Sequence, residues 1–463
     1  MPSMAELLWQ RAAAWAARSA PPAAAILPLF GAPALADGLS LEQAVAAGDV
    51  AAARAALDQG ASAGETLAYG ESLLARAIET QQPRMVALLL AQGAKPNVAD
   101  AEGLTPLVLA CERGNAEIVG QLIEARANVR RAVPDGTTPL ATCARFSTAA
   151  TVERMLAAGA KVDTPDSRGQ TALMWAASAG KAQSAAMLLE AGARIDRTTK
   201  AGFTPLFFAV ASGSAETTRL LLDAGADVSH RGPESTSAPQ LAAYQKNWDA
   251  LRMLVERGGV DLAERDRNGE QLLHVAAASG DEPLVGLLLA NGADPNGLTG
   301  PSRITWVTEA NFGMPPPPVP PTPPLLIAAR HGNVPVMRAL VAAGAQPAFV
   351  AANGTNVVLA AAAGRSAEAL KEALAMAPDA NAANAAGATA LHMVIGGGMH
   401  GELGAMLRVL ADHGARADLA DARGTTPAAM AQGGLATVKA IYDQVFGQKA
   451  APVLAPALAE AHP

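Results

Sequence analysis

The stretch Gly202-Phe203-Thr204-Pro205-Leu206 recurs at a fixed spacing and decides the fold of this chain. Related phrases precede it at steps of 33 residues: Gly103-Leu104-Thr105-Pro106-Leu107, Gly136-Thr137-Thr138-Pro139-Leu140 and Gly169-Gln170-Thr171-Ala172-Leu173. A second series of glycines, each followed by alanine, runs in step at Gly93, Gly159, Gly192, Gly225 and Gly292. A constant period of this size indicates a stack of similar supersecondary units.

Each repeat carries the signals of two helices. Thr followed by Pro starts a helix, because the hydroxyl can cap free N–H groups and proline fits the first turn. Alanine pairs such as Ala176-Ala177 let the two helices approach closely, and the leucines at 220–222 fill the space between repeats. Glycine after the second helix, as at Gly225, supplies a left-handed cap. One unit is too small to bury its own apolar face, so neighbours must stabilise each other.

This pattern resembles the ankyrin repeat, a hairpin turn followed by T-P-L-H-x-A-A, a glycine, a helix ending in Leu-Leu, and G-A-D-x-N. Here it reads Gly202-Phe203-Thr204-Pro205-Leu206, Gly213, Leu220-Leu221-Leu222 and Gly225-Ala226-Asp227. The resemblance implies an all-α repeat solenoid of about eleven helix-turn-helix units joined by β-hairpin-like loops, over residues 39–448. The degenerate repeats and one long insertion look like exported bacterial ankyrin-repeat proteins.

The organisation expected along the chain has six parts. They are a signal peptide (1–36), an N-terminal capping repeat (37–70), ankyrin repeats (71–300), a Pro-rich insertion (301–321), further repeats with a C-terminal cap (322–448) and a disordered tail (449–463). The insertion could dock on an aromatic-lined module as a polyproline II strand, although a stiff spacer is the favoured interpretation.

The first 36 residues have the features of an export signal. Arg11 and Arg18 precede an apolar stretch at 23–30, and Ala34-Leu35-Ala36 matches a small-x-small cleavage signature. A disordered Ala-rich leader or a start at Met4 are the alternatives. We therefore expect a periplasmic or secreted protein that meets the membrane only through this signal.

Two repeats depart from the pattern. At 126–159, Arg126 and Ser147 stand where glycine is usual. At 236–269, Pro239 replaces the first-helix leucine, Lys246 replaces a glycine, and Gly258-Gly259 adds a residue. The second of these repeats is the expected soft spot of the stack.

Composition excludes several classes of function. The net charge of −7 argues against a general nucleic-acid binder, and 3% aromatic residues suit an Ala- and Leu-packed repeat rather than a globular enzyme. Two cysteines, Cys111 and Cys143, could pair in an oxidising compartment. Equivalent helices lie ~8–10 Å apart, whereas a disulfide needs Cα atoms ~5.5 Å apart. The repeat register therefore favours two free, buried thiols.

No catalytic or cofactor motif is found in the sequence, and we expect no enzyme activity, cofactor or metal. His274 and His392 fall where the repeat normally has a histidine that bonds loop backbone. His400 and His413 have no metal-ligand spacing. An enzyme with its site in the insertion, where Thr305, Thr308 and Glu309 are the plausible groups, is a remote alternative.

Ankyrin stacks usually bind proteins through hairpin tips and the exposed side of the first helix, which line a concave face. In this register the candidate contacts precede or follow the hairpin glycine, or precede the mid-repeat glycine. They are Tyr69, Glu71, Glu102, Glu112, Arg113, Asp135, Arg145, Phe146, Arg168, Lys200 and Phe203, and Trp175 is a further candidate contact outside this register.

Aromatic residues gather in three adjacent repeats. Phe146, Trp175 and Phe203 come together there with Phe207 and Phe208, which suits an interaction hot spot. Trp175 and Phe208 occupy a position that often packs between first helices, so local packing remains an alternative for them. Arg145, Arg168 and Lys200 would form a basic rim that favours an acidic patch on the partner.

The sequence thus predicts a non-enzymatic scaffold in the cell envelope that binds another protein. No nucleic acid and no small-molecule substrate is expected. The alternative within this class is an accessory or protective partner of one periplasmic enzyme.

Overall fold

A computed structural model describes residues 39–67, 71–303 and 320–447 of the chain. The signal segment 1–36, Tyr69, the groups Thr305, Thr308 and Glu309, and the tail 449–463 lie outside the described residues. The described part divides into two compact units, one ending at Ala61 and one beginning at Ser62. The first holds α2 (Leu41–Ala47) and α3 (Val50–Asp58).

The second unit consists of helix pairs, as the 33-residue period predicts. Each pair has a first helix and a second helix. The first helices are α4 (Leu73–Glu79), α6 (Pro106–Arg113), α8 (Pro139–Phe146), α10 (Ala172–Ser178), α12 (Pro205–Ser212), α14 (Ala238–Tyr244), α16 (Leu272–Ser279), α18 (Pro324–Arg330), α20 (Val357–Ala363), α22 (Ala390–Gly396) and α24 (Pro427–Gly433).

The second helices alternate with them along the chain. They are α5 (Pro83–Ala91), α7 (Ala116–Glu124), α9 (Ala149–Ala157), α11 (Ala182–Glu190), α13 (Ala215–Asp223), α15 (Trp248–Arg257), α17 (Glu282–Ala290), α19 (Val334–Ala342), α21 (Ala367–Met376), α23 (Leu403–Asp412) and α25 (Ala436–Phe446). A short 3-10 helix, η2 (Pro233–Ser235), precedes α14.

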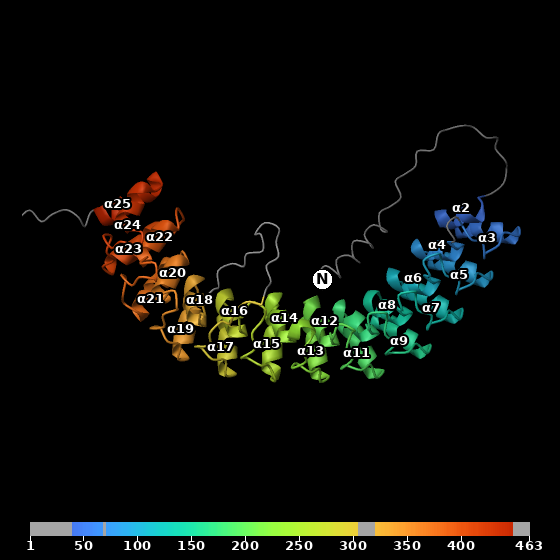
Figure 1. Cartoon of the computed structure of the whole chain (residues 1–463). Coiled ribbons are helices and arrows are strands. Elements are labelled where there is room, and N and C mark those ends of the chain that lie inside the picture. The colour runs from blue at the N-terminus through green and yellow to red at the C-terminus, as the bar shows by residue number, and fades with distance from the viewer. Residues whose placement is uncertain (1–38, 68–70, 304–319, 448–463) are drawn as a thin grey trace, which may run out of the picture. The chain divides into compact units, whose positions relative to one another are not determined.

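The helices of this unit form two layers (Figure 1). Each first helix packs on the first helices of the neighbouring pairs, and each second helix packs on second helices in the same way. Ala176, Ala177 and Ala209 are fully buried between first helices, and Leu221 is buried in the second layer. Stability therefore comes from contacts between neighbours, as expected of a stack.

The expected helix signals are largely confirmed. The Thr105 hydroxyl accepts a hydrogen bond from the Val108 amide, and Thr138 caps α8 in the same way, whereas Thr171 and Thr204 make no such bond. The glycines that follow the second helices α5, α9, α11 and α13 take a positive φ, for example 88° at Gly93. These glycines end their helices in the left-handed conformation.

The hairpin glycines also permit close approach between repeats. Gly136 has a φ of 84°, and a Cβ atom there would lie 3.0 Å from the backbone nitrogen of Ser167. The neighbouring tips are joined at that point, since the Ser167 amide donates to the Asp135 carbonyl at 2.8 Å. A side chain at Gly136 would push these two tips apart.

His274 and His392, at the place where the repeat normally has a histidine, have the structural role expected of them. Nδ1 of His274 accepts from the Gln271 amide at 3.2 Å, and Nε2 bonds the Gly297 and Thr322 carbonyls at 3.0 and 3.1 Å. His392 repeats the arrangement, with the Thr389 amide at 3.1 Å and the Thr425 carbonyl at 3.0 Å. Each ring therefore ties its own helix start to the next loop.

The expectation of two free thiols is wrong. Cys111 and Cys143 form a disulfide, with their Cα atoms 4.5 Å apart. The spacing between helix axes overestimates this distance, because both residues lie where α6 and α8 face each other. Ala110 and Ala144 beside them are fully buried, and such small residues let the helices close up. The Ser147 hydroxyl also donates to the Cys111 carbonyl at 3.2 Å.

The irregular repeat at 236–269 still forms a complete helix pair, α14 and α15. Pro239 lies in the first turn of α14, where no intrahelical N–H is needed. Lys246 takes the glycine place with a φ of 57°, and Arg126 does the same with 63°. Both side chains thus sit in a backbone conformation that favours glycine.

The ends of the insertion are held together beside α18. The Thr299 amide donates to the Thr322 carbonyl at 3.1 Å, and the Thr322 amide donates to the Thr299 hydroxyl at 3.0 Å. The intervening residues 304–319 lie outside the described part of the chain. The helix pairs resume directly after this closure, at Pro324.

Candidate functional site

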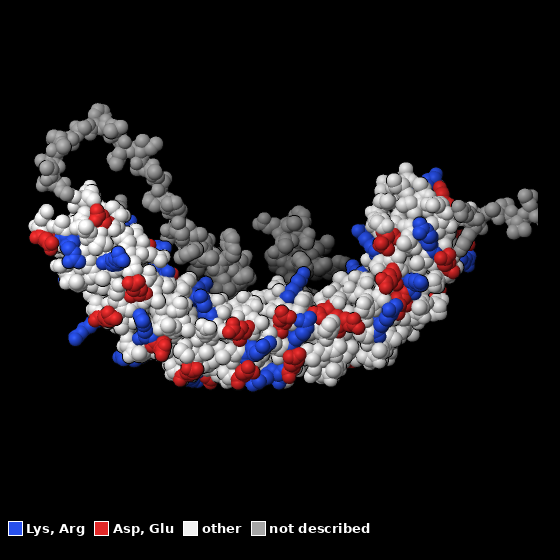
Figure 2. Space-filling view, turned by 180° about the vertical axis from the view of Figure 1, so that it is seen from behind, with Lys and Arg blue, Asp and Glu red and all other residues white. Residues whose placement is uncertain are grey.

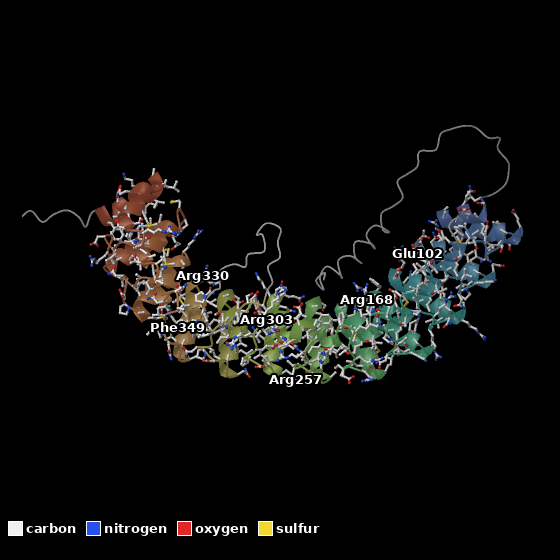
Figure 3. All side chains as sticks on the ribbon, viewed as in Figure 1. Glu102, Arg168, Arg257, Arg303, Arg330 and Phe349 are labelled. Atoms are coloured by element: carbon white, nitrogen blue, oxygen red, sulfur yellow. A yellow bond between two sulfur atoms is a disulfide. The ribbon has the colours of Figure 1, made fainter. Side chains whose placement is uncertain are left out.

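The predicted contacts come together at the C-terminal ends of the first helices and at the hairpin tips. We call the group Arg145, Phe146, Trp175, Arg168, Lys200 and Phe203 the aromatic-cation patch. Figure 3 shows Arg168 and Glu102 at the edge of the first-helix layer, and Arg257 at the opposite edge, on the second helices. The repeat register thus places these residues along one side of the stack.

Arg145 joins two aromatic rings of adjacent repeats. Its guanidinium carbon lies 5.3 Å from the centre of the Phe146 ring and 5.4 Å from that of Trp175. Contacts at this distance are attractive, because a cation interacts with the negative face of the ring. Arg145 therefore links the end of α8 to α10.

The two rings differ in accessibility. Phe146 is 38% exposed, which is consistent with its predicted role as a contact. Trp175 is only 7% exposed, so its prediction as a surface contact is corrected. It lies in the middle of α10, on the side that packs against neighbouring first helices, and Arg145 covers the rest of its ring. The alternative of local packing holds for Trp175, and also for Phe208, which is 3% exposed.

Phe203 is half-buried and belongs to a small aromatic cluster. Its ring meets Phe207 edge-on at 5.5 Å and Phe208 at 6.3 Å. Phe207 is almost completely buried, at 1% exposure. Phe203 therefore closes the outer side of a packed cluster, and it offers a partner only the remaining part of its ring.

The basic rim lies on two adjacent hairpin tips. The Lys200 amide donates to the Arg168 carbonyl at 2.8 Å, so the backbone fixes the spacing of these tips. Both side chains are exposed. Asp135 continues the row on the preceding tip through its carbonyl bond to the Ser167 amide.

Glu112 and Arg113 end α6 and are half-buried, while Glu102 on its hairpin tip is exposed. The disulfide lies directly beside them. It joins α6 to α8 one residue before Glu112 and two residues before Arg145. The bridge therefore fixes the spacing of two repeats at the predicted surface. Glu71, at the start of α4's repeat, forms an ion pair with Arg76, whose Nη2 lies 2.8 Å from its Oε2. Burial raises the pKa of the Glu71 carboxyl.

A pocket that the sequence predictions missed lies between α14, α16 and α18. Its volume is about 390 Å³. Tyr244, Trp248, Leu272 and Val275 supply apolar surface. The polar residues around it include Lys246, Asp266, Asn268, Glu270 and His331.

The repeat register places Tyr244 and Glu270, two residues of this pocket, at positions equivalent to predicted contacts. Tyr244 stands 99 residues, or three periods, after Arg145, so both hold the same place at the end of a first helix. Glu270 follows hairpin Gly269 as Phe203 follows Gly202. Tyr244 is 64% exposed and, like Phe146, lies against an arginine, with the Arg267 guanidinium carbon 4.8 Å from its ring.

Charges of both signs are mixed on the face shown in Figure 2. Figure 2 shows Lys and Arg interspersed with Asp and Glu over the face seen there. No group of three or more His, Cys, Asp or Glu side chains suited to a metal ion occurs within the described ranges. No helix in those ranges is both long and apolar enough to cross a bilayer.

Comparison with known proteins supports the repeat assignment. The protein-family model described as "Ankyrin repeats (3 copies)" matches overlapping segments that together run from residue 41 to 298: 41–133, 73–166, 109–199, 140–232 and 206–298. Delta-latroinsectotoxin-Lt1a of Latrodectus tredecimguttatus is 36% identical over 74 residues. That match covers 16% of this chain and 6% of the toxin, so this chain spans only a small part of the toxin's length.

Proposed function

Since this chain belongs to the ankyrin-repeat family, we propose that it is an interaction scaffold of the cell envelope that binds another protein through the ends of its first helices and its hairpin tips. The observation that carries the proposal is the position of Phe146. An aromatic side chain 38% exposed, with Arg145 against its ring and with the exposed Arg168 and Lys200 on the next two hairpin tips along the chain, has the composition of an interaction hot spot.

The disulfide supports the envelope location. Stable disulfides form in oxidising compartments such as the periplasm and are rare in the cytosol. Cys111 and Cys143 are both fully buried and bridged. Together with the leader sequence, this favours export with cleavage after Ala36. Mass spectrometry of the chain from its own cells should give a mature start at Asp37, and an uncleaved chain in the cytoplasm would contradict export.

Site-specific photo-crosslinking tests the binding face. A photoreactive amino acid at position 146 or 168 should give a discrete adduct with one partner in the native compartment. The matched control is position 257, which Figure 3 shows on the opposite edge of the stack. Adducts of equal yield from 257, or from 257 alone, would contradict the proposed face.

The basic residues also indicate the chemistry of the partner. Arg145, Arg168 and Lys200 belong to the same adjacent repeats as Phe146 and Phe203, in a chain whose net charge is −7. An acidic patch on the partner would complement them and speed association at low salt. We assign the chain no catalytic role.

A further inference from the structure

The pocket between α14, α16 and α18 combines apolar walls with an acidic group that has no counter-ion among the described residues. The ring of Tyr244 is largely exposed, whereas Leu272 is buried and Val275 is half-buried. Ala278, on the same row as Tyr244, contributes only a methyl group.

Glu270 is the acidic group. Its carboxylate accepts no hydrogen bond and forms no ion pair with any other described residue. Burial, and then the charge of Asp266, raises the pKa of this carboxyl, while His331 opposes the shift. Asp266 itself is committed to its turn, since Oδ1 accepts from the Asn268 and Glu270 amides at 2.8 and 2.9 Å.

The basic residues described around the pocket form no ion pair with Glu270. Lys246 and His331 both line the pocket, and among the described residues neither is hydrogen-bonded to the Glu270 carboxylate. Arg267 donates to the Tyr244 hydroxyl at 2.5 Å, and Arg303 reaches the Arg265 carbonyl at 3.4 Å. A cation brought by a partner would therefore meet an unpaired carboxylate.

We propose that this pocket receives an arginine or lysine side chain of a partner polypeptide, with Glu270 as its counter-ion and Tyr244 and Val275 against its methylene stem. This inference rests on the proposed function as a protein-binding scaffold and adds a second contact point to it. The side chain would enter along the same row of first-helix ends that holds Arg145.

Two observations favour this occupant. The volume of about 390 Å³ lies near the lower end of the ~300–1,000 Å³ usual for ligand pockets, which suits a side chain better than a large metabolite. Long basic side chains bury an apolar stem while the charged head seeks a polar partner, which matches the order of groups here. The Arg267 contact shows that the Tyr244 ring accepts a cation at its face.

Peptide selection on the intact chain tests this proposal. A phage-displayed library of random 12-residue peptides is selected on the wild-type protein, and the selected peptides are then titrated against wild type and Glu270→Gln. We expect the wild-type binders to share one Arg or Lys position. Binding of the consensus peptide should weaken on the order of 10-fold in Glu270→Gln, since hydrogen bonds to charged groups contribute that much.

Controls separate this site from the rest of the surface. Glu256→Gln removes an exposed acid from α15 of the preceding repeat and should leave binding unchanged. Replacing the basic peptide residue by Gln should add no further loss in Glu270→Gln, because the two groups act as one pair. Circular dichroism checks that each variant is folded.

Several results would overturn the proposal. Binders without a basic position, or equal binding by Glu270→Gln, would show that the pocket takes no cation. A Pro-rich and aromatic consensus resembling residues 304–319 would assign the pocket to the chain's own segment. Peptides that depend on Phe146 but not on Glu270 would leave the scaffold proposal standing and remove only this inference, whereas a library without binders would count against both.

Discussion

Cys111 and Cys143 are joined across the last turns of α6 and α8, immediately before Glu112 and shortly before Arg145. The covalent link thus crosses between two repeats at the base of the aromatic-cation patch. In a stack that depends on neighbour contacts, a link of this kind ties the stability of one repeat to that of the next.

Loss of the bridge should destabilise this part of the stack. It joins residues 32 apart, and closing a loop of that length contributes about 3–4 kcal/mol in the chain-entropy account. Urea unfolding of the wild type should therefore shift to lower urea when a reductant is added. The Cys111→Ala/Cys143→Ala variant should not respond to the reductant, and an equal midpoint for oxidised and reduced wild type would contradict the prediction.

Lys246→Gly should stabilise the irregular repeat by about 1 kcal/mol. Lys246 has a φ of 57°, and this left-handed conformation costs about 1–2 kcal/mol for a residue with a Cβ atom. Glycine avoids this cost, but it loses more backbone entropy on folding, which offsets part of the gain. Hydrogen exchange should show slower opening of α14 and α15. Arg154→Gly, in the middle of a regular helix, is the control and should destabilise by ~1 kcal/mol; a loss of protection in Lys246→Gly would refute this account of the site.

Glu270 should make stability depend on pH. Its folded-state pKa is raised above the usual 4.5, so the protonated form is favoured in the folded protein. The resulting stabilisation is fully present below the unfolded-state pKa and is lost as pH rises through the raised value. Glu270→Gln should therefore melt at a higher temperature than wild type at pH 7, with the difference disappearing below pH 4.5. A difference of the same size at both pH values would show that the carboxyl is not destabilised by burial.

Phe146→Ala and Phe203→Ala should separate binding from packing. Phe146 is exposed at the end of α8, so its loss should change stability by less than ~0.5 kcal/mol and weaken partner binding by about 1–2 kcal/mol. Phe203 covers Phe207 and Phe208, so its loss should also cost about 1–2 kcal/mol of stability, less than the 3–5 of a fully buried ring. Thermal melting and titration with the captured partner measure the two effects; a large drop in melting temperature for Phe146→Ala would make it a packing residue.

The sequence predicted the repeated helix pairs because glycine at fixed spacing has few physical explanations. The positive φ of Gly136 and the loop bonds of His274 follow directly from that pattern. The same register predicts Phe146 as a contact, and its side chain is 38% exposed at the end of α8, while its role in binding stays a prediction.

The repeat period does not give the distance between two particular residues. The disulfide was missed because the average spacing of helix axes does not give the separation of Cys111 and Cys143 where the helices touch. Trp175 was misplaced because an aromatic residue at its position can turn toward either neighbour. The pocket at Tyr244 was missed because the residues around Lys246 that depart from the repeat pattern were interpreted only as lowering the stability of that repeat. Tyr244 nevertheless holds the same place at the end of its first helix as Arg145.

Hydrogen exchange on the complex with the crosslinked partner tests the central claim most directly. Binding should slow exchange at the ends of the first helices and at the hairpin tips, in the segments 143–147, 166–170 and 198–203. The second helices of the same repeats, α9 and α11, should exchange as in the free chain. Protection confined to α9 and α11, with those three segments unchanged, would show that the partner binds the other layer and would contradict the account.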